Sequence, residues 1–285
     1  MKPVRIDAQP EFPFALTYRD TKPPQRELPD HLHDWYELVY VHSGKGSFFI
    51  DRTIYDMRAG DLFILPGSTI HRAFPDKDEP VTSTALFLSP ILVEQPSLGE
   101  AFSYLQCFEQ SRASRSFKLE CPPELQSRIE LCLDEMETEL RLGRIGYRHA
   151  VVLLTEQLLL AVNREKSGEL RPKSLSSFSG PAWMRDILLY IDHRFTEDIG
   201  LGSLCARAAV SPAHFSRVFK QLTGMNVTGF IAAKRIIRAK ELLLETDDSI
   251  ATIAAACGFE SMPHFHRVFK GIVGLTPAAF RQQAE

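Results

Sequence analysis

The sequence predicts an α+β protein of two domains, and three observations support this fold class. Segments rich in β-branched and aromatic residues, separated by turn signals, occupy roughly the first ninety positions. Apolar residues at helical spacing follow from about residue 124 onward. A heptapeptide then occurs twice, fifty positions apart, as HFSRVFK from His214 and HFHRVFK from His264. The length of 285 residues also favours two domains over one.

The composition is that of a globular protein and argues against several other classes. Hydrophobic residues make up 44% of the chain and charged residues 24%. The first residues contain no apolar segment of signal-peptide length, and the most apolar stretch, residues 150–162, is too short to span a bilayer. Five cysteines without a CxxC pair argue against a disulfide scaffold. We therefore expect a cytoplasmic protein with no membrane partner.

The N-terminal segments are predicted to be strands. YELVYV, GSFFID and DLFILP are short and rich in β-branched and aromatic residues, and the turn signals HSGKG and RAG separate them. Two helices are predicted after residue 124, joined by a tight turn at Gly143. Their apolar stripes are Leu125, Ile129, Leu133, Met136 and Leu140 in the first helix, and Val151, Leu154, Leu158 and Ala161 in the second. This helical hairpin either covers the sheet or packs on a partner subunit, and the stripes predict a homodimer.

A segment rich in Ser, Gly and Pro, residues 166–181, is the predicted linker. It divides the chain into an effector-binding and dimerisation domain, residues 1–165, and a helical domain, residues 182–285. The helical domain contains the duplicated heptapeptide.

Each copy of the heptapeptide predicts a buried amphipathic helix. In both copies the two phenylalanines and the valine lie at i, i+3 and i+4, and a further apolar residue follows at i+7. Ser211 and Ser261 are expected to cap these helices, each close to a proline. Short helices rich in small residues precede both copies at a distance of a few residues. Helix, tight turn and longer helix form a helix-turn-helix, and the chain contains two of them.

The opposite face of each heptapeptide helix is polar and basic. The first copy carries Ala213, Ser216, Arg217 and Lys220 on this face, and the second carries Pro263, His266, Arg267 and Lys270. Arginine bonds two acceptors on guanine and lysine reaches a phosphate, so this face suits the major groove of double-stranded DNA. A solvated surface is the alternative, but duplication of the same basic positions favours DNA. His214 and His264, beside the buried face, are expected to be structural, with contact to a phosphate as the alternative.

A continuous helix is predicted between the two copies, over residues 229–245, with Asn226 as its cap. Such a rod would hold the two recognition helices at a fixed separation. To enter successive major grooves on one side of DNA, they must lie about 34 Å apart.

The segment 183–281 resembles the paired helix-turn-helix domain of the AraC/XylS family of bacterial transcription regulators. The second copy carries the fuller signature, IAAACGFESMPHFHRVFKGIVGLTPAAFR, and RIIRAKELL resembles the family's linker helix. The first copy departs from it by having Asn226-Val227 where the second has Thr276-Pro277. The resemblance implies that bases are contacted by Ala213, Ser216 and Arg217 in the first copy and by Met262, His266 and Arg267 in the second.

A second pattern occurs in the strand region, in HLHDWYELVYVHSG and GDLFILPGSTIH. If the first is a strand, His31, His33, Trp35 and Glu37 share one face. The spacing resembles the two cupin motifs, with His71 as the third histidine and Ser68 where the second motif has glycine. This resemblance implies a double-sheet β-barrel over about residues 12 to 90.

The cupin resemblance leaves two kinds of site open. His31, His33, Glu37 and His71 either bind a divalent metal such as Fe, Mn, Ni or Zn, or line a pocket that hydrogen-bonds a hydroxylated effector beside Trp35. The family resemblance favours an effector that is a sugar or related metabolite.

The function expected from these patterns is a ligand-responsive regulator of promoter DNA, without enzymatic activity. It would control genes for uptake or catabolism of its effector, act as a homodimer and contact RNA polymerase. A metal-dependent cupin enzyme or a metal-responsive regulator is the alternative. A protein-interaction module is disfavoured, because it would need an apolar outer face on the heptapeptide helices, where the sequence has Arg and Lys.

Overall fold

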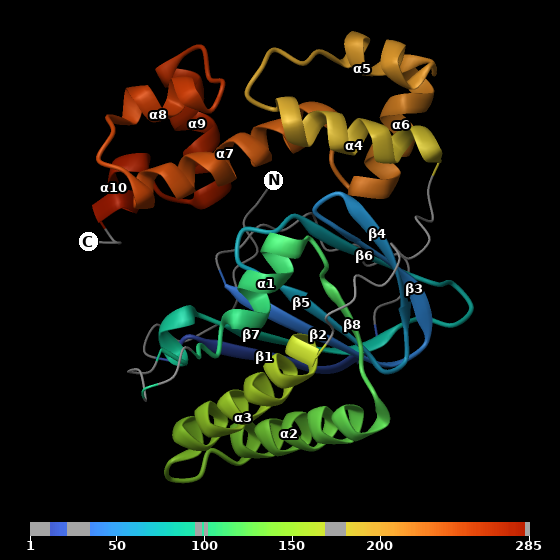
Figure 1. The fold of residues 1–285 in the computed structure, drawn as a ribbon, viewed down its shortest axis with the longest axis vertical. Coiled ribbons are helices and arrows are strands. Elements are labelled where there is room, and N and C mark those ends of the chain that lie inside the picture. The colour runs from blue at the N-terminus through green and yellow to red at the C-terminus, as the bar shows by residue number, and fades with distance from the viewer. Residues whose placement is uncertain (1–11, 22–34, 95–98, 100–101, 169–180, 283–285) are drawn as a thin grey trace.

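The computed structural model describes residues 12–21, 35–94, 99, 102–168 and 181–282. An N-terminal part built of two β-sheets and accompanying helices lies against a C-terminal part that is helical throughout its described residues (Figure 1). The α+β class and the two-part architecture expected from the sequence are thus confirmed. Residues 169–180, most of the predicted linker, lie outside the described residues.

The N-terminal part contains two antiparallel sheets. One has the order β1-β7-β2-β5-β8 and the other the order β4-β3-β6. The strands are β1 (Phe14–Thr21), β2 (Tyr36–Ser43), β3 (Lys45–Ile50), β4 (Thr53–Arg58), β5 (Asp61–Leu65), β6 (His71–Pro75), β7 (Thr82–Leu88) and β8 (Lys118–Glu120). A core of buried side chains from both sheets lies between them, including Val39, Val41, Phe48, Ile50, Tyr55, Met57, Phe63 and Leu65. This is the double-sheet barrel that the cupin-like spacing implied.

Side chains of β2 alternate between two cores. Val39 and Val41 point into the core between the sheets, whereas Leu38 and Tyr40 belong to a second core on the other face of the five-stranded sheet. This is the two-residue period of a strand whose faces are both covered. The chain then turns at Gly44, where φ is +82° and a Cβ atom would lie 2.2 Å from the Pro80 carbonyl oxygen. No other residue type fits this turn, because a side chain would overlap that backbone.

Helices cover the outer face of the five-stranded sheet. They are the 3₁₀ turn η1 (Pro90–Leu92), α1 (Gln106–Ser114), α2 (Pro123–Leu142) and α3 (Tyr147–Gly168). The hairpin of α2 and α3 matches the prediction, although α3 continues into the predicted linker, and α1 and β8 were not predicted. The stripe residues Leu125, Ile129, Leu133, Met136, Val151, Leu158 and Ala161 are buried against the sheet. Of the two alternatives for these stripes, they cover the sheet, so the reason given for expecting a dimer was wrong.

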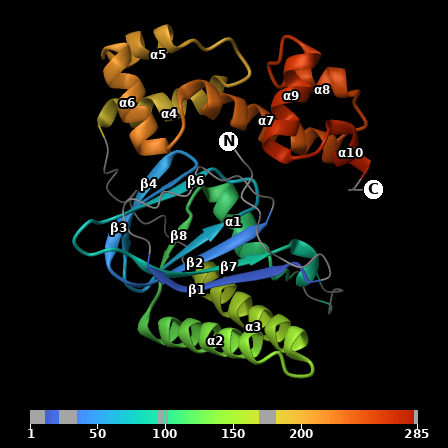
Figure 2. The ribbon, with the colours of Figure 1, turned by 180° about the vertical axis from the view of Figure 1, so that it is seen from behind.

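The C-terminal part consists of seven helices in its described residues. They are α4 (Ala182–Arg194), α5 (Leu201–Ala208), α6 (Pro212–Thr223), α7 (Val227–Glu245), α8 (Ile250–Ala256), α9 (Met262–Val273) and α10 (Pro277–Gln282). Helices α5 and α6 form the first helix-turn-helix and α8 and α9 the second, with α7 extending between them (Figures 1 and 2). The Asn226 side chain caps α7 by accepting a hydrogen bond from the Gly229 amide at 2.7 Å.

The repeated phenylalanines form the two helical cores. Phe215 and Phe219 are fully buried in the core of the first unit, and Phe265 and Phe269 in that of the second. Each such side chain stabilises its unit by about 1.5–3 kcal/mol through removal of apolar surface from water.

Two contacts hold the helix-turn-helix units together in addition to the continuity of α7, and one of them is made by a side chain of α7. Gly258, at the turn after α8, has φ +82°, and a Cβ atom there would lie 2.2 Å from the Thr196 carbonyl oxygen. Arg235 on α7 donates hydrogen bonds to the carbonyl oxygens of Phe195 and Glu197, and its guanidinium lies over the Phe259 ring at 5.7 Å. The two units are therefore held as one body.

The three-stranded sheet packs on the first helical unit (Figures 1 and 2). Phe49, Ile54 and Ile70 are buried in the same core as the helices of that unit, and the Phe49 and Phe230 ring centroids lie 6.2 Å apart. Phe48, the neighbour of Phe49 on β3, faces the barrel interior instead. Adjacent residues of one strand thus serve the barrel core and the interdomain contact. No helix of the described residues is long and apolar enough to cross a membrane.

Candidate nucleic-acid interface and barrel site

Helix α6 presents its polar and basic face, the first of the two faces predicted to contact DNA and called reading faces below, to solvent. Ser211 caps the helix through its side chain, which accepts from the His214 amide at 3.4 Å, and Pro212 occupies the first turn. Because Phe215 and Phe219 are buried in the core, the opposite side of the helix faces solvent. The predicted contact residues Ala213, Ser216, Arg217 and Lys220 are all exposed. The first reading face is therefore accessible in the described structure.

Helix α9 presents the second face in the same way. Pro263, His266, Arg267 and Lys270 are exposed, whereas Met262 is half-buried against the core of its own unit. The capping expected of Ser261 was wrong: this residue stands at the N-cap position, but its side chain makes no capping hydrogen bond there.

The two neighbouring histidines differ in their surroundings. His214 is half-buried, with its ring 6.2 Å from that of Trp183, and its Nδ1 lies 3.2 Å from an Arg217 guanidinium nitrogen. An arginine always donates, so His214 Nδ1 accepts here and holds Arg217 in place. His264 is exposed and has only an edge contact with Phe259 among the ring contacts described, at 5.7 Å. The structural role expected of both histidines thus suits His214 better.

The barrel brings two of the predicted site residues together. Glu37 on β2 and His71 at the start of β6 are buried, and His71 Nε2 lies 3.0 Å from Glu37 Oε2. The His71 ring also packs edge-on against Phe48, with centroids 6.0 Å apart. Trp35 is half-buried at the entry to β2, while His31 and His33 lie outside the described residues.

The hydrogen bond of His71 to Thr69 fixes which ring nitrogen carries a hydrogen. Its Nδ1 lies 2.9 Å from the Thr69 carbonyl oxygen, which only accepts, so Nδ1 carries a hydrogen. Nε2, the other ring nitrogen, faces the Glu37 carboxyl group at 3.0 Å. The two side chains thus present an imidazole nitrogen and a carboxylate oxygen side by side in a buried position.

This arrangement bears on the metal alternative. The described residues contain no group of three or more His, Cys, Asp or Glu side chains placed to hold a metal ion. The 3.0 Å between His71 Nε2 and Glu37 Oε2 is also the spacing of two donor atoms that bind one metal ion at about 2.0–2.1 Å each. Two donor atoms do not make a metal site on their own, and the other two predicted ligands lie outside the described residues.

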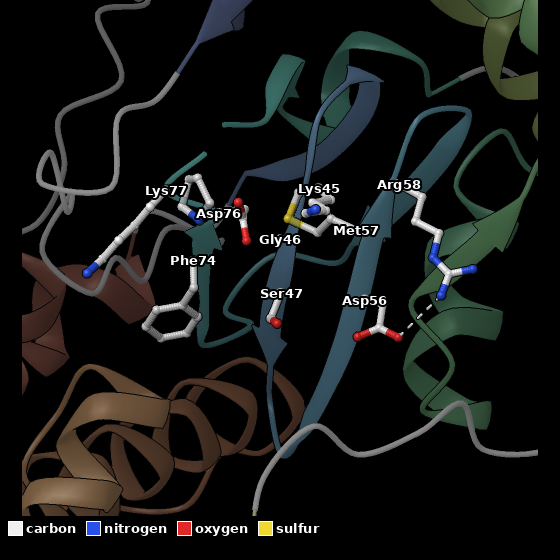
Figure 3. A pocket seen from close by; sticks show the side chains of 10 residues that line it. Lys45, Gly46, Ser47, Asp56, Met57, Arg58, Phe74, Asp76 and Lys77 are labelled. Carbon is white, nitrogen blue, oxygen red and sulfur yellow. Dashed lines mark ion pairs between the residues drawn. The ribbon is translucent and has the colours of Figure 1, made fainter. Parts of the chain in front are cut away.

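A pocket of about 490 Å³ lies on the outer face of the three-stranded sheet and was not predicted (Figure 3). Strand alternation places Lys45 and Ser47 of β3 beside Asp56 and Arg58 of β4, and Phe74 of β6 forms another wall. Lys45 and Ser47 in β3 and Asp56 and Arg58 in β4, each pair two positions apart, were the signal that this end of the face is polar. None of the predicted effector residues lines this pocket, so it is separate from the barrel pair.

Two exposed basic recognition helices on one rod, joined to a two-sheet barrel, define a DNA-binding regulator with a sensory domain. The chain matches a family model described as a helix-turn-helix domain over residues 204–283, and one described as an AraC-like ligand binding domain over residues 13–161. The chain belongs to the AraC family of transcription regulators.

Curated relatives match over most of the chain. It is 25% identical over 275 residues to the HTH-type transcriptional activator RhaS of Pectobacterium carotovorum, which covers 93% of this chain and 91% of that protein. It is 22% identical over 273 residues to the HTH-type transcriptional activator RhaR of Mannheimia succiniciproducens, covering 96% and 93%. The bifunctional transcriptional activator/DNA repair enzyme AdaA of Bacillus subtilis is 38% identical over 103 residues, covering 36% of this chain and 49% of AdaA.

Proposed function

We propose that α6 and α9 read two successive major grooves on one side of promoter DNA. The observation that carries this proposal is the duplicated exposed face, with Arg217 and Lys220 on one helix and Arg267 and Lys270 on the other. Arg217 and Arg267 would bond guanine, whereas the two lysines would contact phosphates. Ala213, Ser216, Met262, Pro263 and His266 would complete the contacts to bases and sugar-phosphate backbone.

We further propose that the barrel binds a hydroxylated small molecule of the sugar class at Glu37 and His71. A carboxylate and an imidazole accept from and donate to hydroxyl groups, and Phe48, which packs on His71, supplies apolar surface for the carbon skeleton. Trp35, two positions before Glu37, is proposed to add to this surface. Because the pair is buried, a ligand that reaches it must displace the mutual contact. His31 and His33 are proposed to complete this site, with an effector rather than a metal as the bound species.

Localisation, oligomeric state, partners and domain bounds complete the proposed function. The chain would act in the cytoplasm as a non-enzymatic homodimer that responds to its effector and contacts RNA polymerase at genes for uptake or catabolism of that effector. Residues 1–165 would form the sensory and dimerisation domain, 166–181 the linker and 182–285 the DNA-binding domain.

Selection of DNA by the full-length protein from a random duplex pool tests the reading face. Affinity for the selected duplex is then measured at fixed salt for Arg217→Ala and Arg267→Ala. We expect each variant to weaken binding by about 1–3 kcal/mol and to relax the sequence preference at one half-site. Arg141→Ala, an exposed arginine on α2, is the matched control and should bind like the parent. Unaltered affinity in both reading-face variants would refute the assigned face.

A thermal-shift screen of the full chain against a panel of sugars and sugar acids tests the effector class. A ligand that binds the folded state raises its melting temperature. We expect a shift that Glu37→Gln reduces, whereas Glu79→Gln, an exposed carboxylate paired with Lys45, leaves it intact.

A further inference from the structure

The loop between β5 and β6, residues 66–70, touches both the barrel site and the DNA-binding domain. Its inner end is bound to His71, since His71 Nδ1 donates to the Thr69 carbonyl oxygen at 2.9 Å. The Thr69 hydroxyl donates back to the Pro66 carbonyl oxygen at 2.6 Å, which closes the loop on itself. A change at His71 therefore acts directly on the backbone of this loop.

The middle of the loop, at Ser68, meets α7, the helix that joins the two helix-turn-helix units. Lys240 Nζ on α7 donates to Ser68 Oγ at 2.7 Å. The same ammonium group lies 5.4 Å from the ring centre of Phe280 on α10, next to the core of the second unit. Lys240 is 6% exposed, so its charge lies in a largely water-excluded position between barrel and second unit. Removing an oxygen acceptor from a buried ammonium is unfavourable.

Ser68 has an unusual backbone for its residue type. Its φ is +62°, in the left-handed region that glycine adopts without strain and serine rarely adopts. The second cupin motif has glycine at this position, so the serine is the departure noted in the sequence. Glycine has no hydroxyl group to accept from Lys240. The contact with Lys240 thus gives a physical reason for a strained serine where glycine would fit better.

A second connection runs from the same loop to the other interdomain contact. The Asp51 amide donates to the Ile70 carbonyl oxygen at 2.7 Å, and the Asp51 carboxylate pairs with Lys234 on α7. The loop is therefore connected to two lysines on one helix, directly from Ser68 to Lys240 and through Asp51 from Ile70 to Lys234.

We propose that loop 66–70 transmits occupancy of the barrel site to the DNA-binding domain through the Ser68–Lys240 hydrogen bond. This inference rests on the proposed function, in which a ligand displaces the Glu37–His71 contact. When a ligand replaces Glu37 at His71 Nε2, the imidazole ring turns, its Nδ1 hydrogen bond to the Thr69 carbonyl weakens, and the loop shifts. Ser68 then leaves Lys240, and α7 loses one of its attachments to the barrel. Coupling between two sites needs two such states with different ligand affinities.

The test uses Glu37→Gln in the full-length protein as a stand-in for displacement of the barrel pair. DNA affinity is measured with a duplex selected by the parent protein, with and without Glu37→Gln, in four backgrounds. These backgrounds are the parent, Ser68→Gly, Lys240→Met and the control Lys166→Met. Ser68→Gly suits the left-handed backbone, so it removes the hydroxyl without harming the fold. Lys166 on α3 donates to Ser116 within the N-terminal part and lies apart from the loop.

We expect Glu37→Gln to change DNA affinity by about fivefold or more in the parent and in the Lys166→Met background, as is typical of coupled sites. In the Ser68→Gly and Lys240→Met backgrounds the change should fall below about twofold. The same change in all four backgrounds would overturn the relay while leaving coupling between barrel and DNA intact. No change in any background would also overturn it.

Hydrogen exchange of the free protein gives a readout that does not depend on DNA. Glu37→Gln should raise amide exchange in residues 66–70 in every background, and in α7 only where Ser68 and Lys240 are both present. Arg112→Met, which removes an exposed arginine that donates to the Gly67 carbonyl oxygen, perturbs the loop from outside if Glu37→Gln fails to fold. Unchanged α7 exchange when the loop is loosened would overturn the relay, whereas failure of the parent to select any duplex contradicts the proposed function alone.

Discussion

Arg52 in the β3–β4 turn and Asp192 on α4 lie 140 positions apart in the chain and meet at 2.8 Å. Asp192 also accepts from Arg115 at 2.5 Å and from Lys234 at 3.1 Å, and its side chain is 9% exposed. One buried carboxylate on the first helix-turn-helix unit therefore receives two cations from the barrel side and one from α7. This cluster fixes the first unit against the barrel.

Replacement of Asp192 by asparagine is expected to weaken this interdomain contact. The variant would leave Arg52, Arg115 and Lys234 close together without their shared negative charge, and breaking a buried ion pair in this way costs about 3–5 kcal/mol. We expect early separation of the two domains in urea, observed as a first transition by fluorescence of Trp183. Asp186→Asn, on the exposed side of the same helix, is the matched control and should unfold like the parent.

Lys240 predicts a rise of stability in alkaline solution. Burial lowers the pKa of Lys240 from 10.5 to about 8. Between these values the unfolded chain binds a proton that the folded chain has released, so the free energy of unfolding increases with pH in this window, by up to about 3 kcal/mol. Urea denaturation of the parent and of Lys240→Met between pH 7.5 and 10.5 measures the difference. If the two curves run parallel, and Lys166→Met matches them, Lys240 is not the group responsible.

Lys220 and Lys270 are predicted to contact phosphates rather than bases. Their replacement by alanine should weaken binding of every duplex by a similar factor and lower the slope of log K against log salt by about 1 for each lysine. Titrations at several salt concentrations with the selected duplex and a scrambled one measure this slope. A loss confined to the selected duplex would instead assign these lysines to base recognition.

The dimer predicted for this chain requires a different surface from the buried stripes. Leu131 on α2 and Leu153 on α3 point away from the sheet and are 58% and 65% exposed. We expect the parent to sediment as a dimer at micromolar concentration and Leu131→Glu with Leu153→Glu to sediment as a monomer, because a charge buried in an apolar contact is costly. Ile91→Glu, an exposed apolar residue on η1, is the control. A parent that remains monomeric contradicts the dimer.

Much of the fold could be predicted from local pattern. The heptapeptide gave the buried positions Phe215, Phe219, Phe265 and Phe269, because the period of a helix is short enough to be read within seven residues. The prediction that Glu37 shares one face with the other odd positions of β2 was also correct: Val39 and Val41 both belong to the core between the sheets. Strand alternation depends on the backbone alone, so it can be predicted locally. Helix α1 was missed because its sequence, QCFEQSRAS, has few apolar residues to mark a face.

The contacts between domains were beyond a local reading. Nothing near Arg52 indicates that its partner is Asp192, and nothing near Ser68 indicates Lys240, because these pairs form only when the sheet and α7 pack together. Similarly, the apolar stripes of α2 and α3 show that one face is buried but not which surface covers it. For Ser68, the departure from the motif was visible in the sequence, but the left-handed backbone that explains it was not.

The continuous helix α7 and the close approach of Gly258 to Thr196 have a consequence for the promoters that this protein would recognise. Two recognition helices, α6 and α9, held at a fixed separation and angle require a constant number of base pairs between the two DNA segments, or blocks, that they contact. Insertion of a single base pair would rotate one block by about 35° around the duplex axis, out of line with its recognition helix. Promoter variants with altered spacing would therefore escape regulation even with both blocks unchanged in sequence.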